Sequence, residues 1–398
     1  MPIVNEYGFR VPVKLIIVGN GFDIAIGAKT TYDAFYECLK KCSRSENFES
    51  FKKDYFYEGN EKLIDLFHQI VKKNQKNYFI NYFLKYANAF GNWVSFEKEL
   101  TKIIKAFDDL ATFLNSPDRL IVYPSSGGCA RVYVRVFDNT GLLQVLSVYP
   151  NNRFFSTDLK QYPREGVQYL SFKFKGKTFK DIYGFYNRAA DFAHGVAKEL
   201  FDDLTVFSNL FSLYLGIVDH YVKPGYRLKG VDQRSLFINY NFTNYLTAFV
   251  EGGESGFKKI ININGLVDNS SAVPETNIVF GIDSDTQVSN HQFEVFTKRI
   301  QRSIKETDIK FLELMLSERI TEIEVIGHSL NLADYESLNF IFSKTDVRKP
   351  KITVYYYDKE SKSDLVINLE QILGKNVFDD YQRQGLLKFV NSKEAWEK

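Results

Sequence analysis

The sequence of 398 residues predicts an α/β protein with a mostly parallel, doubly wound sheet. Three observations support this class. A short apolar run near the start ends directly in glycines, as strands buried on both faces of a parallel sheet do. After residue 235, short apolar runs alternate with helical patterns. The long stretch between is helical at its ends and strand-like in its middle, so we expect one core interrupted by an insertion.

The first elements follow from the apolar spacing. Residues 14–18 (Lys-Leu-Ile-Ile-Val) are expected as the first strand, with a glycine turn directly after it. Thr30 or Thr31 is a suitable N-cap for the helix that follows. Spacing typical of helices is found at 31–41, 48–55, 62–72, 77–88 and 94–106.

The middle of the chain has a different pattern. Alternating, β-rich runs occur at 119–123, 131–137, 142–148 and 168–174. Turn-forming residues, such as Ser125-Ser126-Gly127-Gly128, separate them. These features predict an antiparallel insertion of hairpins, after which helices resume at 179–220.

The last part of the chain returns to strand-helix alternation. Strands are expected at 235–240, 259–263, 277–280, 322–326 and 351–357, and helices at 287–304, 309–318 and 335–342. We therefore predict three regions. Residues 11–30 and 231–398 form a Rossmann-like nucleotide-binding core, 31–118 and 176–230 form a large helical insertion, and 119–175 form a smaller antiparallel β insertion.

Composition narrows the class of protein. The formal net charge is +2 with 25% charged residues, and this balance argues against nucleic acid as the main partner. Cys38 and Cys42 lack the second Cys pair or the His-rich spacing of a zinc site, so no metal site is predicted. The sequence shows neither a secretory signal nor an apolar run of about 18 residues. We expect a cytoplasmic protein that is not embedded in a membrane.

The glycine turn Gly19-Asn20-Gly21-Phe22-Asp23 is the first candidate for chemistry. Glycines after the first parallel strand let the backbone approach a phosphate, which the next helix N-terminus can hold. Ile24 interrupts a full Gly-x-Gly-x-x-Gly pattern, and no Gly-Lys-Ser/Thr follows as in a P-loop. Asp23 can cap a helix or contact a ribose or metal, and the alternative is a purely structural turn.

Polar residues and glycines also follow the later strands. Because the carboxyl ends of parallel strands meet in one crevice, we expect these residues to lie close together. They are Asn239, Asn241, Asn264, Gly265, Gly281, Asp283, Gly327, His328, Ser329 and Asp334. The alternatives are asparagines that satisfy turns and a structural or nucleotide-contacting His328.

One further motif lies outside the predicted sheet. Asn92-Trp93 and Phe96-Glu97 open a helix that can direct Glu97 into the crevice. The alternative is a packed helix N-terminus, where a carboxylate is stabilised by the helix dipole. Signatures of serine hydrolases, zinc proteases and kinases are absent from the sequence.

Six of these motifs resemble the bacteriophage abortive-infection AbiH family. They occur in the family's order between about residues 14 and 342. They are Gly19–Asp23, Asn92-Trp93 with Phe96-Glu97, Asn239–Asn244, Asn264-Gly265, Phe280–Asp283, and Gly327–Leu330 with Asp334. The resemblance implies anti-phage defence in bacteria.

The same order of motifs resembles, more distantly, sirtuin-like domains, which bind NAD and in some anti-phage systems hydrolyse it. On this resemblance Asn241 matches the motif asparagine, and Asn264 stands where the catalytic histidine would be. Thr243 replaces the motif acid. Because asparagine cannot act as a base near neutral pH, any chemistry must use other groups, such as His328 or Asp23.

We therefore predict Asn241, His328 and Asp23 as catalytic residues. The residues expected to bind NAD or another nucleotide are Gly19, Asn20, Gly21, Phe22, Asn239, Asn264, Gly265, Gly281, Asp283, Gly327, Ser329 and Asp334. Three hypotheses remain: an effector that hydrolyses NAD or a related nucleotide, a nucleotide-binding sensor without catalysis, and a protein acting on nucleic acid through Lys-rich helices. A phage-derived trigger and a homo-oligomer are expected partners, with residues 119–175 as the region that recognises the trigger or forms the oligomer.

Overall fold

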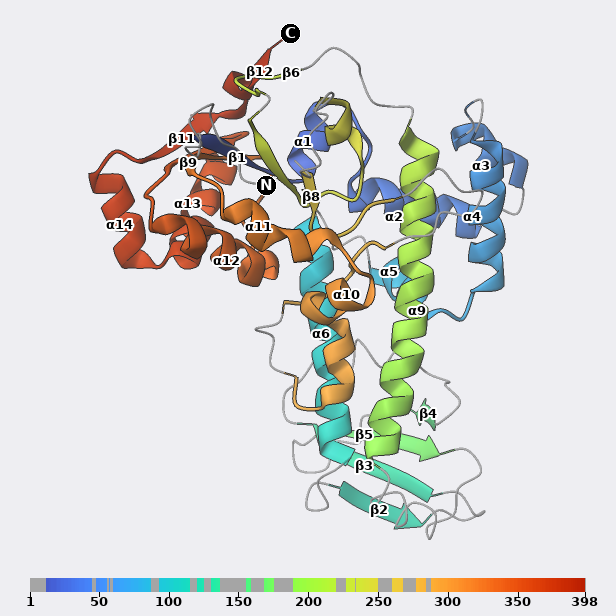
Figure 1. The fold of residues 1–398 in the computed structure, drawn as a ribbon. Coiled ribbons are helices and arrows are strands. Elements are labelled where there is room, and N and C mark those ends of the chain that lie inside the picture. Colours follow the sequence, from blue (N-terminus) through green and yellow to red (C-terminus); the bar gives the residue numbers. More distant parts are fainter. Residues whose placement is uncertain are drawn as a thin grey trace.

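The computed structural model describes most of the chain. The described residues are 12–44, 48–55, 57, 60–86, 93–114, 120–124, 130–136, 155–158, 168–174, 189–219, 227–232, 234–249, 260–267, 277–283 and 288–397. Their main body is a parallel sheet flanked by helices, with a long helical layer beside it (Figure 1).

The sheet has six strands, and all of its pairs are parallel. The strands are β1 (Val13–Val18), β7 (Leu236–Asn239), β8 (Ile260–Asn262), β9 (Ile320–Ile326), β10 (Lys351–Tyr356) and β11 (Leu387–Asn391). They lie in the order β11-β10-β9-β1-β7-β8. Counted along the chain, the spatial order is 3-2-1-4-5-6, so the winding direction reverses between β1 and β9. Val18 pairs with both Asn239 and Ile326, which brings three strand ends together.

Both faces of the central strand are covered. Successive side chains of a strand point to opposite faces. Leu15 and Ile17 pack with residues of α11 (Leu312–Leu316), α12 (Tyr335–Asp346), α13 (Lys359–Leu373) and α14 (Lys375–Arg383). Ile16 and Val18 pack instead with Phe22 of α1 (Asn20–Ala25) and with Leu246. Burial on both faces explains why β1 is apolar from Leu15 to Val18, and the α/β class is confirmed.

A layer of helices with an aromatic core follows the first strand. It comprises α2 (Tyr32–Arg44), α3 (Phe48–Tyr55), α4 (Glu61–Lys73), α5 (Tyr78–Tyr86), α6 (Trp93–Leu114) and α9 (Ala189–Val218). The predicted helices agree with these within a few residues, except that α6 continues to Leu114 and that residues 179–188 of the predicted helical segment 179–220 lie outside the described residues. Thr31 caps α2, because its hydroxyl accepts a hydrogen bond from the Ala34 N–H.

Helix α9 is the described helix that is long and apolar enough to cross a membrane. Its apolar segment is Ala193–Val218, and 67% of the most apolar window is buried. It packs against α4, α5 and α6. This packing accounts for its composition as that of a core helix.

A second, antiparallel sheet lies between α6 and α9 in the sequence. Its strands are β2 (Leu120–Pro124), β3 (Ala130–Val136), β4 (Phe155–Asp158) and β5 (Gln168–Phe174), in the order β2-β3-β5-β4. It lies at the ends of α6 and α9 that point away from the parallel sheet (Figure 1). The antiparallel pairing is as predicted, β4 is additional, and the predicted strand at 142–148 lies outside the described residues.

Several predicted elements are wrong in detail. Residues 277–280 form no strand, and Val279 makes a single backbone bond to the Asn264 carbonyl. The predicted helix 287–304 is interrupted at Thr297, whose extended backbone separates a 3₁₀ helix (His291–Phe296) from α10 (Lys298–Ile304). The predicted helix 309–318 begins with a 3₁₀ turn (Asp308–Phe311) before α11.

Elements near the C-terminus were not predicted. They are α13, α14, β11 and a short antiparallel pair of β6 (Arg227–Leu228) with β12 (Trp396–Glu397). The division of the chain into three regions stays a prediction.

Candidate functional site

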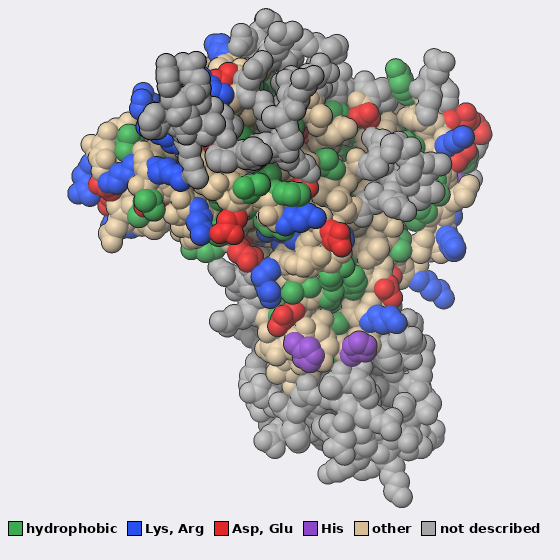
Figure 2. Space-filling view, in the orientation of Figure 1, with side chains coloured by type: hydrophobic (Ala, Val, Ile, Leu, Met, Phe, Trp, Pro, Cys, Tyr) green, Lys and Arg blue, Asp and Glu red, His purple; other side chains and the backbone are tan. Residues whose placement is uncertain are grey.

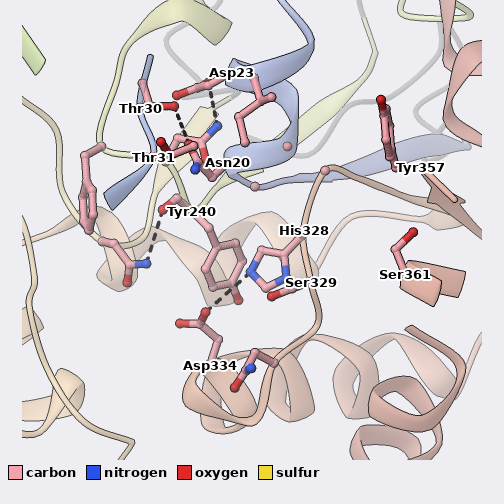
Figure 3. Close-up of a pocket in the computed structure, with 18 of the residues that line it drawn as sticks. Asn20, Asp23, Thr30, Thr31, Tyr240, His328, Ser329, Asp334, Tyr357 and Ser361 are labelled. Atoms are coloured by element: carbon pink, nitrogen blue, oxygen red, sulfur yellow. Dashed lines mark hydrogen bonds and ion pairs between the residues drawn. The ribbon is translucent and has the colours of Figure 1, made fainter. Parts of the chain in front are cut away.

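A cavity of about 800 Å³ opens at the carboxyl ends of the parallel strands (Figure 3). The loops after β1, β7, β9 and β10 all contribute to its wall. Ten of the predicted site residues line it: Gly19, Asn20, Gly21, Asp23, Asn241, Asn264, Gly327, His328, Ser329 and Asp334. The cavity therefore lies where the sheet order reverses, which is the usual position of a ligand in open α/β sheets.

The glycines of the first turn are required by a close approach of two loops. A Cβ on Gly19 would lie 2.6 Å from the His328 Cα, and one on Gly21 would lie 2.7 Å from the Gly327 Cα. Gly327 itself has a φ of +67°, and its Cβ would lie 2.2 Å from the Phe22 nitrogen. The backbone N–H groups of Gly19 and Gly21 donate to the carbonyls of Ile326 and Gly327. These hydrogen bonds join the glycine turn to the end of β9. They agree with the alternative that the turn has a structural role.

Gly327→Ala should destabilise the fold far more than Gly385→Ala. Both glycines have nearly the same positive φ, +67° and +66°, but nothing lies within 4 Å of a Cβ on Gly385. The control variant should cost roughly 1–2 kcal/mol for the left-handed backbone alone. The Gly327 variant adds a clash with the backbone of Phe22 and Gly21, so its free energy of unfolding should fall several kcal/mol further. Urea unfolding of both variants measures this, and equal losses would contradict it.

Asp23 is a buried carboxyl in the wall of the cavity. Only 1% of the residue is exposed. The Thr243 hydroxyl donates to its Oδ2 at 2.6 Å, and the Asn241 amide donates to its Oδ1 at 2.9 Å. Burial raises the pKa of Asp23 from 3.8 to about 7, against the opposing effect of these two hydrogen bonds. A carboxyl with this pKa can both accept and release a proton at neutral pH.

The loop after β7 is held by its own asparagines. The Asn239 amide donates to the Thr243 carbonyl and to the Asn262 side chain, at 3.2 and 3.0 Å. The Asn239 oxygen accepts from the Asn241 N–H. Asn239 therefore does not line the cavity, and it fixes the loop that directs Asn241 and Thr243 toward Asp23.

His328 is held with one ring nitrogen already occupied. Its Nδ1 accepts a hydrogen bond from the Leu330 N–H at 2.9 Å, so a neutral ring carries its proton on Nε2. Nε2 faces the Asp334 Oδ2 at 3.6 Å, and the Tyr240 ring packs against the imidazole edge-on (Figure 3). This arrangement favours His328 as a hydrogen-bond donor and wall residue over the role of general base.

A cluster of buried charged and polar residues adjoins the cavity, and two of its members, Asp334 and Asn264, line it. The Lys298 ammonium contacts the Glu97 Oε1 at 2.5 Å and the Asp334 Oδ1 at 2.7 Å. Arg302 approaches the same Asp334 oxygen at 3.8 Å and donates to the Asn264 side chain at 3.0 Å. All five residues are buried. We call these five residues the charge cluster.

The pKa values within the charge cluster move apart. Burial raises the pKa of Glu97 to about 7, although Lys298 opposes the shift. Burial also opposes ionisation of Asp334, but Lys298, His328 and Arg302 together outweigh it and hold the pKa of Asp334 well below its usual range. The sequence left open whether Glu97 points into the crevice or only starts a packed helix. Its carboxyl contacts Lys298, and Glu97 is not among the residues that line the cavity.

Four other predicted site residues lie outside the cavity wall. Phe22 is buried and stacks on Trp396. Gly265 has a φ of +80° and packs against the Asn277 backbone, and Gly281 packs between Phe296 and Lys298. The Asp283 carboxylate accepts from the Tyr335 N–H at the start of α12. Each of these positions supports the loops around the cavity.

Other lining residues were not predicted. Thr30 donates to the Asn20 side chain at 2.6 Å, and Lys98 of α6 lies at the wall. The far end is formed by Tyr355, Tyr357, Ser361, Asp364 and Asn368, from β10 and α13. The tyrosines follow the same strand-end rule that identified the asparagines, so that rule could have found them. The residues of α13 carry no local signal, because only the packing of this helix brings them to the cavity.

Comparison with known proteins gives one match. Residues 15–356 match the family described as "Bacteriophage abortive infection AbiH". This span covers far more than half of the chain. Neither a curated protein nor a solved structure matches the chain.

Proposed function

Because this chain belongs to the AbiH family of bacteriophage abortive-infection proteins, we propose that its part in anti-phage defence depends on a nucleotide bound in the cavity. The proposed reaction is hydrolysis of NAD or a related nucleotide, which would deprive an infected cell of it. The observation that carries this proposal is Asp23, a buried carboxyl that lines the cavity and has a pKa raised to about 7.

The sheet supports nucleotide binding. Its strand order, 3-2-1-4-5-6, is that of dinucleotide-binding Rossmann folds, and the cavity lies at the reversal of the order, where such folds bind their ligands. Its volume of about 800 Å³ lies within the usual range for small-molecule sites. We propose on these grounds that the core is Rossmann-like.

The proposed chemistry needs one proton acceptor beside the scissile bond. Water attacks C1′ of the ribose, and the bond from C1′ to the base nitrogen breaks with its electron pair leaving on the base. Ionised Asp23 takes the proton of the attacking water and later releases it to solvent. Asn241 and Thr243 hold the carboxylate by donating hydrogen bonds to its two oxygens. The products are the free base and the remainder of the nucleotide, which carries a hydroxyl group at C1′.

A specific observation favours a second candidate, a nucleotide-binding sensor without catalysis. The Asn264 oxygen accepts from Arg302, and its amide donates to the Tyr240 carbonyl at 3.4 Å. His328 Nδ1 is occupied by Leu330. Neither side chain is therefore available as a base. The choice between an enzyme and a sensor without catalysis thus depends on whether Asp23 acts as a base.

A nucleic-acid function receives less support. On the face drawn in Figure 2, Lys and Arg side chains alternate with Asp and Glu over the described surface. Binding to a phosphate backbone requires a continuous basic stripe instead. We keep as proposals a cytoplasmic location, a phage-derived trigger recognised through residues 119–175, and assembly into a homo-oligomer.

Asn241→Ala should abolish phage protection and the accompanying loss of nucleotide. The substitution removes the donor to Asp23 Oδ1 and a polar group from the cavity wall. NAD and ATP are measured in cells with wild type or variant, before and after infection. A fall in NAD or ATP in the wild type alone is the expected result.

The matched control is Asn244→Ala, because Asn244 belongs to the same loop but is exposed and does not line the cavity. It should behave as wild type. Unchanged NAD and ATP in protected wild-type cells would exclude hydrolysis and leave the sensor. Full protection by the Asn241 variant would exclude the cavity from defence altogether.

A further inference from the structure

Three backbone donors of the glycine turn are already occupied by carbonyls of this chain. The N–H groups of Gly19, Gly21 and Phe22 donate to Ile326, Gly327 and Gly19 carbonyls, at 3.0, 2.8 and 2.9 Å. Helix α1, which follows, has only six residues. A phosphate at this turn would have to break hydrogen bonds that hold the two loops together, so this turn is a poor phosphate site.

The two cations of the charge cluster lie outside the cavity wall. Lys298 and Arg302 are 3% and 5% exposed, and neither lines the cavity. The Lys298 ammonium contacts Glu97 and Asp334, and Arg302 approaches Asp334 and donates to Asn264. Neither cation is therefore placed to contact an anion in the cavity.

The charged groups that do line the cavity are mostly acidic. Besides Asp23 and Asp334, the exposed residues Asp33 and Asp364 line it, and neither of these two forms an ion pair with another described residue. Among the described residues that line the cavity, Lys98 of α6 is the one Lys or Arg, and its position is exposed. The wall beside Thr243 is apolar, formed by Phe211, Leu215 and Phe242.

Resting on the proposed function, we infer that the cavity recognises the nucleoside part of its ligand, a ribose with a neutral or cationic base. Apolar walls suit a flat base, and unpaired carboxylates suit ribose hydroxyls or a positively charged ring. The phosphates of the ligand lie at the rim of the cavity, where Lys98 can form an ion pair with them. A nucleoside triphosphate, with its high negative charge, is therefore a poor ligand.

Calorimetric titration of the purified full chain tests this with three probes: nicotinamide riboside, NAD and ATP. Nicotinamide riboside carries a cationic base and no phosphate, and ATP carries a neutral base and three phosphates. We expect nicotinamide riboside and NAD to bind about tenfold tighter than ATP, or more. Replacing both Asp33 and Asp364 by Asn should narrow this difference by raising the affinity for ATP.

Lys98→Gln tests the position of the phosphates. It should lower the affinity for NAD severalfold, and by a larger factor at low salt than at high salt. The affinity for nicotinamide riboside should stay unchanged. Lys105→Gln is the matched control, because Lys105 is exposed on the same helix and does not line the cavity. Its affinities should equal those of wild type.

The outcomes separate this inference from the proposed function. ATP binding as tightly as nicotinamide riboside, or hydrolysis of ATP, would overturn the inference and leave nucleotide hydrolysis standing. Equal effects of Lys98→Gln on NAD and nicotinamide riboside would also overturn it. Failure of all three probes to bind would overturn both.

Discussion

Asp23→Asn should reduce turnover of the nucleotide by about 10²–10⁴-fold and leave the chain folded. The substitution keeps the volume of the side chain and an oxygen that can accept from Asn241 or Thr243. It removes the one carboxylate, among the described residues of the wall, that is buried without a cation beside it. In the wild type, the rate should rise with pH through about 7, because the ionised form is the base. The variant should lack this dependence.

The same substitution should stabilise the fold at alkaline pH. Burial raises the pKa of Asp23 from 3.8 to about 7, so the folded chain holds a proton that the unfolded chain releases between these values. The wild type therefore loses stability as the pH rises through this window, by about 4 kcal/mol in total at about 1.4 kcal/mol per pKa unit. The variant avoids this loss.

Urea unfolding and turnover are measured at about pH 4.5 and pH 8 for both proteins. The stability gain of Asp23→Asn should be about 3 kcal/mol larger at pH 8 than at pH 4.5. Wild-type turnover by the variant would remove Asp23 from the mechanism. A stability difference that does not change with pH would show that the carboxyl has an ordinary pKa.

Lys298→Met should lower the free energy of unfolding by about 3–5 kcal/mol. Met retains a straight apolar chain but leaves Glu97 and Asp334 buried without the cation that contacts both, at 2.5 and 2.7 Å. The loss should grow as the pH rises. Without Lys298, burial holds the pKa of Glu97 even higher than about 7, and its ionisation on unfolding favours the unfolded chain at alkaline pH.

A second substitution isolates the charge effect. Lys298→Met combined with Glu97→Gln leaves Arg302 to balance Asp334, so the double variant should be more stable than Lys298→Met alone. Lys349→Met serves as the control, because it breaks an exposed pair with Asp380, 48% and 36% exposed, and should hardly change the free energy of unfolding. Equal losses for Lys298→Met and Lys349→Met would show that the charge cluster does not stabilise the fold.

Local patterns were enough to predict most elements that position the site. The apolar run of β1 and the glycines after it carry their information within a few residues, and so do the helices of the aromatic layer. The rule that parallel strand ends converge grouped Asp23 with Asn241, which are 218 positions apart and hydrogen-bonded. The same rule included Gly265 and Asp283, which support loops outside the cavity wall.

Sequence patterns predicted the α/β class, the edge of the sheet at which the cavity lies and the motifs of the AbiH family. The chemistry of that edge depends on contacts that form only on folding. The raised pKa of Asp23 comes from desolvation, and the occupied Nδ1 of His328 comes from a loop contact. The charge cluster forms where Lys298 and Arg302 of α10 meet Glu97 of α6, Asp334 and Asn264. Periodicity and turn preferences act between neighbours in the chain, whereas burial and charge pairing depend on distances that exist only after folding.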